Sequence, residues 1–211
     1  MSFDMSNMTT HASHTFLSKT LSPRLVVQVS TIGSDGVYNV APFASNGIIC
    51  YKPAILFVGI SSKNDGGKKD TLLNIEYSGD FVINVVDEDM AESINKAAVA
   101  YPINVDEFQM SGLTALPCDK VKSPRVKESP ISFECKVLQI LQYSEAPNIR
   151  SVVLGQALVT HIRDGLYKDG HMDVLKKNAI VHHGGNNYSR TTDTFEIKNC
   201  YDLPSGRPVS L

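Results

Sequence analysis

Hydroxyl and ammonium side chains gather between residues 59 and 75, where the sequence reads GISSKNDGGKKDTLLNI. Ser61, Ser62 and Thr71 supply hydroxyl groups, and Lys69 supplies an ammonium group just before a run with helical character. The first turn of a helix offers free N–H groups and the positive end of a dipole. Donors of these kinds bind phosphate groups. The stretch therefore predicts a site for a small phosphorylated anion.

This stretch does not match the phosphate-binding loop of nucleotide hydrolases, GxxxxGK[ST]. With Lys68 in the lysine position, the leading glycine falls on Ser62 and the final hydroxyl falls on Lys69. Both positions fail, so this motif is absent. The alternative to a phosphate site is a solvated loop of lysines in which Asp70 or Thr71 caps a helix.

A second polar segment, NVAPFASNG at residues 39–47, has a proline inside a run that otherwise reads as a strand. Pro42 has no N–H for a sheet ladder, which predicts an edge strand, a bulge or a strand break. Hydrogen-bonding and apolar side chains lie side by side here, namely Asn39, Ser45 and Asn46 around Ala41, Pro42 and Phe43. The segment suits a flat, half-polar ligand, or it is an edge strand that runs into a turn.

Motifs for metal binding and for nucleophilic catalysis are absent from the sequence. The four cysteines are widely spaced and lack a CxxC pair, which predicts small buried or half-buried thiols in a reducing compartment. They are Cys50, Cys118, Cys135 and Cys200. His182 and His183 would face opposite sides of a strand, and His161 and His171 lack a ligand spacing such as HExxH. Without GxSxG or GxGxxG, hydrolase and dinucleotide-fold functions also lack support.

Runs of β-branched and apolar residues predict the elements that carry these segments. They are LVVQVSTI (25–32), VYNVAPF (37–43), NGIICY (46–51), AILFVGIS (54–61), DFVINVV (80–86), ISFECKVLQILQ (131–142) and SVVLGQALVTHI (151–162). The alternation changes phase at Leu138, which indicates a bulge or a corner, and Gly155 marks a bend or a close approach. Six or more strands in hairpin order favour a mainly β antiparallel barrel.

Two short helices are expected between the strands. Asp70 or Thr71 should cap TLLNIEYS, which ends at Gly79. Asp89 and Glu92 form a possible capping box for MAESINKAAVA, which ends before a proline. The polar, proline-rich stretch 101–130 reads as a loop.

The overall composition describes a chain of 211 residues with 20 basic and 22 acidic side chains. A formal charge of -2 argues against binding to nucleic acid or to acidic membrane surfaces. The N-terminus has no signal-peptide pattern, and the most apolar run (54–60) is shorter than the ~20 residues of a membrane-spanning helix. We expect a soluble, cytoplasmic protein.

Several blocks of the sequence, in their order, resemble the flavin reductase-like proteins with an FMN-binding split barrel. The blocks are SPRLVVQVSTIGSDGVYNVAPF, KDTLLNI, SGDFVINVVDEDMAE, VDEFQMSGLT, SPRVKESPISFECKV and GGNNYSRTTDTFEI, from Ser22 to about Ile197. The resemblance implies a six-stranded antiparallel split barrel with added helices, a homodimer, and one FMN per subunit near the dimer interface. It divides the chain into an N-terminal arm (1–20), one domain (21–197) and a C-terminal tail (198–211).

The resemblance also implies which residues bind the cofactor. The 5'-phosphate of FMN would lie at Ser61, Ser62, Lys69, Asp70 and Thr71. The isoalloxazine and ribityl chain would lie along residues 39–46, with Asn84 and Arg190 as further candidates. The chain departs from the family pattern at Ala44, where a serine is usual, so Ser45 and Asn46 either take over polar contacts or leave a more open pocket. Leu73 replaces a common arginine.

The resemblance predicts an FMN-dependent NAD(P)H oxidoreductase, in which hydride passes from a nicotinamide to the flavin and the cofactor performs the difficult chemistry. Such an enzyme can supply a monooxygenase or another redox partner. The absence of an acid–base pair agrees with this chemistry. A non-catalytic FMN-binding carrier or sensor on the same barrel is the alternative, and a barrel without any cofactor is a third possibility.

Overall fold

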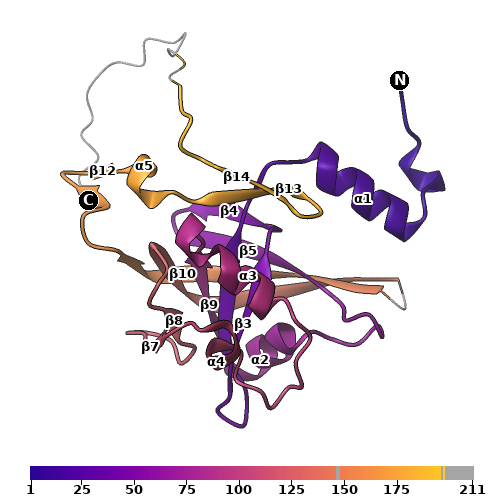
Figure 1. The fold of residues 1–211 in the computed structure, drawn as a ribbon. Coiled ribbons are helices and arrows are strands. Elements are labelled where there is room, and N and C mark those ends of the chain that lie inside the picture. Colours follow the sequence, from indigo (N-terminus) through magenta and orange to yellow (C-terminus); the bar gives the residue numbers. More distant parts are fainter. Residues whose placement is uncertain (146–147, 196, 198–211) are drawn as a thin grey trace.

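The computed structural model describes residues 1–145, 148–195 and 197, and a seven-stranded antiparallel sheet forms its centre (Figure 1). In chain order the strands are β2 (Val27–Ile32), β3 (Tyr38–Phe43), β4 (Asn46–Tyr51), β5 (Ala54–Ser61), β6 (Asp80–Val85), β9 (Ile131–Glu145) and β10 (Asn148–Ile162). Every neighbouring pair runs antiparallel, as the hairpin order predicted.

The spatial order of the strands is β3-β2-β6-β9-β10-β5-β4, so β3 and β4 are the two edges. The prediction of six strands is therefore wrong, and the sheet is not a closed barrel. The number six came from the resemblance to a family, whereas the apolar runs of the sequence include all seven strands. β4 is a separate strand because the chain reverses at Lys52 and Pro53, which pairs Tyr51 with Ala54.

The first hairpin presents Pro42 on the edge strand β3. Residues 33–36 form the predicted turn between β2 and β3, and Gly36 has the positive φ of 82° that glycine adopts easily. Pro42 lies opposite Gln28 and has only this one neighbouring strand. An edge position is the one that a residue without an N–H tolerates, so this prediction is confirmed.

The long strands β9 and β10 contain the predicted irregularity. Leu138 has no partner, because its two neighbours pair with the consecutive residues Leu154 and Gly155. This bulge confirms the change of phase read from the sequence. A Cβ atom on Gly155 would lie 2.5 Å from the ring of Phe81. Close packing of this ring, rather than approach of a ligand, explains the glycine.

Helix α2 (Asp70–Ser78) packs against β2 and β3. It ends at Gly79 in the left-handed conformation (φ 68°), as predicted. Its N-cap is Lys69, and no side chain caps the first turn. The expectation that Asp70 or Thr71 is the cap is therefore wrong, since both residues already lie inside the helix.

The next helical segment begins differently from the prediction. A 3₁₀ turn, η2 (Glu88–Met90), leads into α3 (Ala91–Ala97), whose N-cap is Met90. The capping box of Asp89 and Glu92 does not form, because Asp89 lies within the 3₁₀ turn. The stretch read as a loop contains α4 (Glu107–Ser111), β7 (Ala115–Leu116) and β8 (Arg125–Val126).

Smaller elements lie at the periphery. They are η1 (Met5–Asn7), α1 (Thr10–Thr20), β1 (Arg24–Leu25), β11 (Tyr167–Lys168), β12 (His171–Met172), α5 (Val174–Lys177), β13 (Ile180–Gly184) and β14 (Asn187–Arg190). The predicted N-terminal arm thus contains α1, which contacts β13. The predicted tail, with Cys200, lies outside the described residues. In the described part of the chain, no helix has both the length and the apolar character needed to span a membrane.

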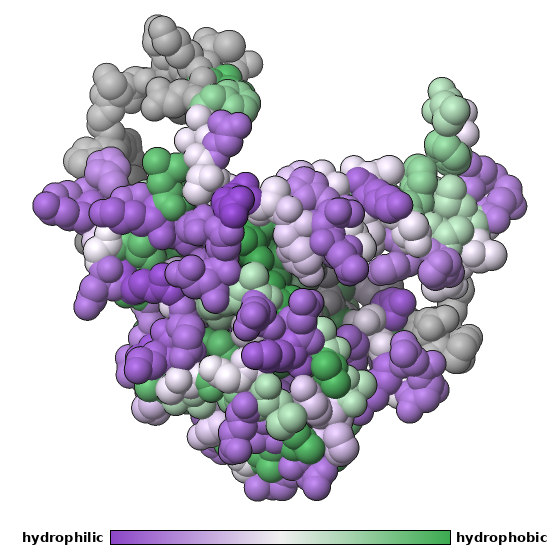
Figure 2. All heavy atoms as spheres, viewed as in Figure 1, coloured by the Kyte–Doolittle hydropathy of each residue, from purple (hydrophilic) through white to green (hydrophobic). Residues whose placement is uncertain are grey.

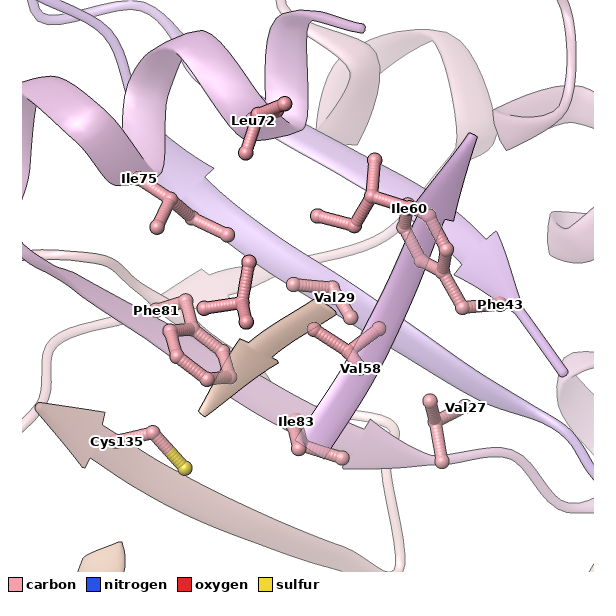
Figure 3. Close-up of a cluster of buried hydrophobic side chains, with 11 residues drawn as sticks. Val27, Val29, Phe43, Val58, Ile60, Leu72, Ile75, Phe81, Ile83 and Cys135 are labelled. Atoms are coloured by element: carbon pink, nitrogen blue, oxygen red, sulfur yellow. The ribbon is translucent and has the colours of Figure 1, made fainter. Parts of the chain in front are cut away.

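The largest core cluster joins the sheet to α2 (Figure 3). Leu72 and Ile75 of α2 face the strands, where Phe43, Ile60 and Phe81 are buried. A second cluster, between β3 and helices α3 and α4, contains buried side chains of Val40, Ile94 and Phe108 among others. Because β3 contributes to both clusters, its position is fixed by packing on both faces.

Candidate functional site

The structure brings the two polar segments of the sequence together at the end of β3 and the start of α2. The ammonium group of Lys69 lies 5.8 Å from the centroid of the Phe43 ring. A buried carboxylate links the same elements, because Glu107 of α4 accepts hydrogen bonds from β3 and interacts electrostatically with Lys69. The segments 39–46 and 61–71 therefore lie next to each other and form one candidate site.

The three lysines of the predicted anion site have different surroundings. Lys63 forms an ion pair with Asp70 (2.7 Å), and Lys68 forms one with Glu76 (2.7 Å). Among the described residues, Lys69 has no carboxylate within the 4.0 Å of an ion pair. Burial lowers the pKa of the Lys69 ammonium and Arg150 lowers it further, whereas Glu107 raises it. Lys69 is thus a half-buried cation that has no ion pair among the described residues.

Arg150 is a cation of this site that the sequence did not reveal. It lies on β10 directly opposite Ser61 of β5, so the two side chains project from the same face of the sheet. The guanidinium is exposed and close enough to Lys69 to lower the pKa of the lysine. Nothing in the segment NIRS signals a site, because only the pairing of β5 with β10 brings Arg150 to it.

The first turn of α2 adds backbone donors. Lys69 occupies the N-cap without a capping side-chain bond, so the amides of Asp70 and Thr71 lack a side-chain acceptor. Ser61 is the last residue of β5 and Ser62 follows it, so both hydroxyls lie at the end of this strand. The backbone N–H of Ser62 donates to a carbonyl of β10. The end of β5, Arg150 of β10 and the uncapped start of α2 thus contribute cations, amides and hydroxyls to the same region.

The outer edge of β3 has few free donors. The N–H of Val40 donates to Oε2 of Glu107 (2.9 Å), and Nδ2 of Asn39 donates to the same oxygen (2.6 Å). Alternate residues of a strand point their N–H groups to the same side, so Pro42 shares this edge with Val40. Because Pro42 has no N–H and β3 ends at Phe43, the edge has no outward-facing strand amide after Val40.

Ser45 and Asn46 stand where the family has other groups. They differ in exposure and in the hydrogen bonds that they already make. Asn46 uses Nδ2 to bond the carbonyls of Leu25 (2.9 Å) and Phe43 (3.3 Å), which holds the chain between β3 and β4. Ser45 is exposed, and its carbonyl accepts the N–H of Gly59 (2.7 Å). Ser45 is therefore the more exposed of the two residues, and its Oγ lies beside Gly59.

Two predicted residues do not lie in this cluster. Asn84 is 0% exposed and bonds within the core: Nδ2 donates to Ser30 Oγ (2.9 Å), and Oδ1 accepts from Val126 N (2.9 Å) and Ser132 Oγ (2.8 Å). Arg190 lies on β14 and forms an ion pair with Glu88. In Figure 1, β14 lies above the central sheet and α2 lies near its lower end.

Arg190 instead lines a cleft of about 460 Å³ between α3 and the β13–β14 hairpin. The other lining residues are Glu88, Ala91, Ile94, Asn95, Ile180, Asn186, Tyr188 and Ser189. Figure 2 shows a mainly hydrophilic face with hydrophobic atoms in the hollow beneath this hairpin. The cleft shares no lining residue with the cluster around Lys69.

Comparison with known proteins identifies the relatives of this chain. Residues 20–176 match the flavin reductase like domain. An uncharacterized protein from Aquifex aeolicus is 31% identical over 177 residues, which cover 83% of this chain and 88% of the relative.

Two solved structures share the fold at 27% identity. Nitrilotriacetate monooxygenase component B from Bacillus cereus has a TM-score of 0.88 and covers 93% of this chain and 98% of its own. The 2-nitrobenzoate 2-nitroreductase NbaA from Pseudomonas fluorescens has a TM-score of 0.86 and covers 98% of this chain and 100% of its own. The chain belongs to the family of proteins with a flavin reductase like domain.

Proposed function

We propose that the protein binds FMN, with the 5'-phosphate at the start of α2 and the ring system along residues 39–46. The observation that carries this proposal is the half-buried Lys69, which has no carboxylate partner among the described residues. Its ammonium lies 5.8 Å from the centroid of the Phe43 ring and close enough to Arg150 for that charge to lower its pKa. Membership of the flavin reductase-like family supports the choice of a flavin.

The charges of the site fit a phosphate dianion. Lys69 and Arg150 contribute two positive charges, and the helix start contributes unpaired amides. Of the two acidic groups nearby, Asp70 is paired with Lys63. Burial raises the pKa of Glu107 to about 7, so a substantial fraction of this carboxyl is protonated near neutral pH. A dianion would therefore meet a net positive environment.

The residues along β3 would orient the ring system. The half-buried Ala41 and Pro42 would supply apolar surface, and the amide of Ala44 and the hydroxyl of Ser45 would supply polar contacts. Glu107 holds the strand through Val40. Fixed placement of this kind brings a nicotinamide and a flavin into reacting distance. Bound FMN would supply the capacity to accept hydride, so the chain needs no acid–base pair of its own. NADH or NADPH is the electron donor that we propose.

The alternative is an FMN carrier or sensor that does not turn over. Anaerobic mixing of the FMN-loaded protein with NADH or NADPH separates the two. Rapid loss of the absorbance of oxidised flavin after mixing supports the reductase. An unchanged spectrum supports a carrier. A purified chain that does not bind added FMN at all would contradict both.

We also propose a homodimer and a redox partner. Ile48 and Ile49 of the edge strand β4 are 59% and 57% exposed, and Tyr51 is 85% exposed, which gives this edge an apolar surface suited to a second copy. One structural relative is named as a monooxygenase component, which supports delivery of reducing equivalents to a monooxygenase.

A further inference from the structure

Three side chains of the kinds that bind transition metals meet where the loop after β7 crosses β9 and β10. They are the thiol of Cys118, the carboxylate of Glu134 on β9 and the imidazole of His161 on β10, and one ligand atom of each lies within 4.8 Å of the other two. Nε2 of His161 is 2.6 Å from Oε1 of Glu134. Separate segments supply the three groups, so their sequence spacing could not reveal the cluster.

The sheet holds the carboxylate and the imidazole together. Glu134 is opposite Val159, and His161 lies two residues further along β10, so the two side chains are diagonal neighbours on one face. Glu134 also accepts the N–H groups of Asp119 (2.8 Å) and Lys120 (2.7 Å). These bonds fix the orientation of the carboxylate, as outer partners of metal ligands commonly do.

The loop that carries Cys118 has a second attachment. Asp80 is buried and accepts the N–H groups of Lys122 (3.1 Å) and Ser123 (3.2 Å), together with the Ser123 hydroxyl (2.7 Å). The loop is therefore held on the sheet independently of the contact between Glu134 and His161. A rigid scaffold of this kind presents the thiol at a fixed place.

The donor set selects the type of metal. Zn²⁺ accepts sulfur, nitrogen and oxygen ligands at about 2.0–2.3 Å, so tetrahedral ligand atoms lie about 3.3–3.8 Å apart. A cluster that spans at most 4.8 Å reaches this spacing with side-chain shifts of about 1 Å. Ca²⁺ and Mg²⁺ prefer oxygen ligands throughout. The side chain of His161 is 23% exposed, which leaves a path from solvent, whereas Glu134 is fully buried.

We propose that Cys118, Glu134 and His161 bind one Zn²⁺ ion, with the fourth position open to water. On binding, the Cys118 thiol releases one proton to solvent and its sulfur donates to the metal, while neutral His161 donates through Nε2. Glu134 contributes one carboxylate oxygen and keeps its backbone N–H bonds. The site is separate from the proposed flavin site and does not depend on it.

The test is a Zn²⁺ titration of the purified full-length chain, stripped of metal and kept in a reductant that does not bind metal. Competition with a chromophoric chelator should give one equivalent per chain. Cys118→Ser and His161→Gln should each weaken binding at least tenfold. Cys50→Ser should not, because Cys50 is a half-buried thiol outside the cluster. Circular dichroism shows whether each variant is folded.

A second control addresses adventitious binding. His11 and His14 lie one turn apart on the exposed face of α1 and could chelate zinc without a built site. The double variant His11→Gln/His14→Gln should still bind one equivalent of Zn²⁺ per chain. Co²⁺ bound to the wild type should give a thiolate charge-transfer band, and Cys118→Ser should abolish this band whereas Cys50→Ser should not. Absence of binding by the wild type, or loss of binding in the α1 variant with retention in folded Cys118→Ser, would overturn the proposal.

Discussion

Single residues decide the charge of the proposed phosphate site. Lys69 is the one of three neighbouring lysines that has no ion pair among the described residues. Arg150, from the distant strand β10, lies close enough to lower its pKa. The lysine was predictable, because it precedes a helix start beside hydroxyl residues. Arg150 was not, because its role depends on the pairing of β10 with β5.

Replacement of Lys69 by alanine should weaken FMN binding by about 1.5 to 3 kcal/mol, since it removes a charge-assisted contact to the phosphate. Fluorescence titration of FMN measures the dissociation constant. Lys68→Ala is the matched control, because Lys68 is paired with Glu76 and should change affinity little. An equal dissociation constant for Lys69→Ala and the wild type would show that the phosphate lies elsewhere.

Glu107 should make stability depend on pH. Burial raises its pKa from 4.5 to about 7, so between these values the folded protein binds more protons than the unfolded chain. Stability from this group is therefore fully present below pH 4.5 and is lost as pH rises toward 7, with a slope of at most about 1.4 kcal/mol per pH unit.

Glu107→Gln should flatten this part of the stability curve, because its amide oxygen can still accept from Val40 and Asn39. Urea denaturation at several pH values between 4.5 and 7.5 measures the slope. Glu92→Gln on the exposed face of α3 should leave the wild-type slope unchanged. Parallel curves for Glu107→Gln and wild type would argue against a raised pKa at Glu107.

At the scale of elements, periodicity predicted the strands well and the helix starts poorly. The seven apolar runs correspond to the seven strands, and the bulge at Leu138 follows from the change of phase. The predicted first residues of the helices were wrong, because the position of the N-cap depends on the direction from which the chain enters the helix. Helix α2, which packs on β2, begins at Asp70. This is one residue earlier than if Asp70 were the N-cap. Hydrogen bonds between loop N–H groups and carboxylates far away in the chain leave no periodic pattern in the sequence, so they could not be predicted.

The packing of the Phe81 ring of β6 against β10 depends on the missing side chain at Gly155. A Cβ atom there would be 2.5 Å from Cζ of Phe81 and 3.0 Å from Cβ of Cys135, so Gly155→Ala should destabilise the fold by about 1–3 kcal/mol. Phe81→Leu removes the ring, and the double variant should be less destabilised than the sum of the two single variants. Thermal or urea denaturation measures the coupling, and strict additivity would contradict this packing.

For the whole molecule, the apolar β4 edge predicts assembly. Ile49→Asp would place a charge on the exposed surface of β4 and should convert the proposed dimer to monomers in analytical ultracentrifugation. Leu175→Asp on α5 alters a residue of similar exposure (52%) away from this edge and should not. A wild-type protein that sediments as a monomer at micromolar concentration would remove the basis for the homodimer.

The two edges of the sheet differ in a way that limits growth. On β3, the N–H of Val40 is already bonded to Glu107 and Pro42 has none, so a foreign strand finds few hydrogen-bond donors there. Of the two edges of the seven-stranded sheet, β4 is the one that carries the exposed side chains of Ile48, Ile49 and Tyr51. If the proposed dimer forms through β4, association through this sheet should end with a pair, because β3 has few donors to offer a further strand.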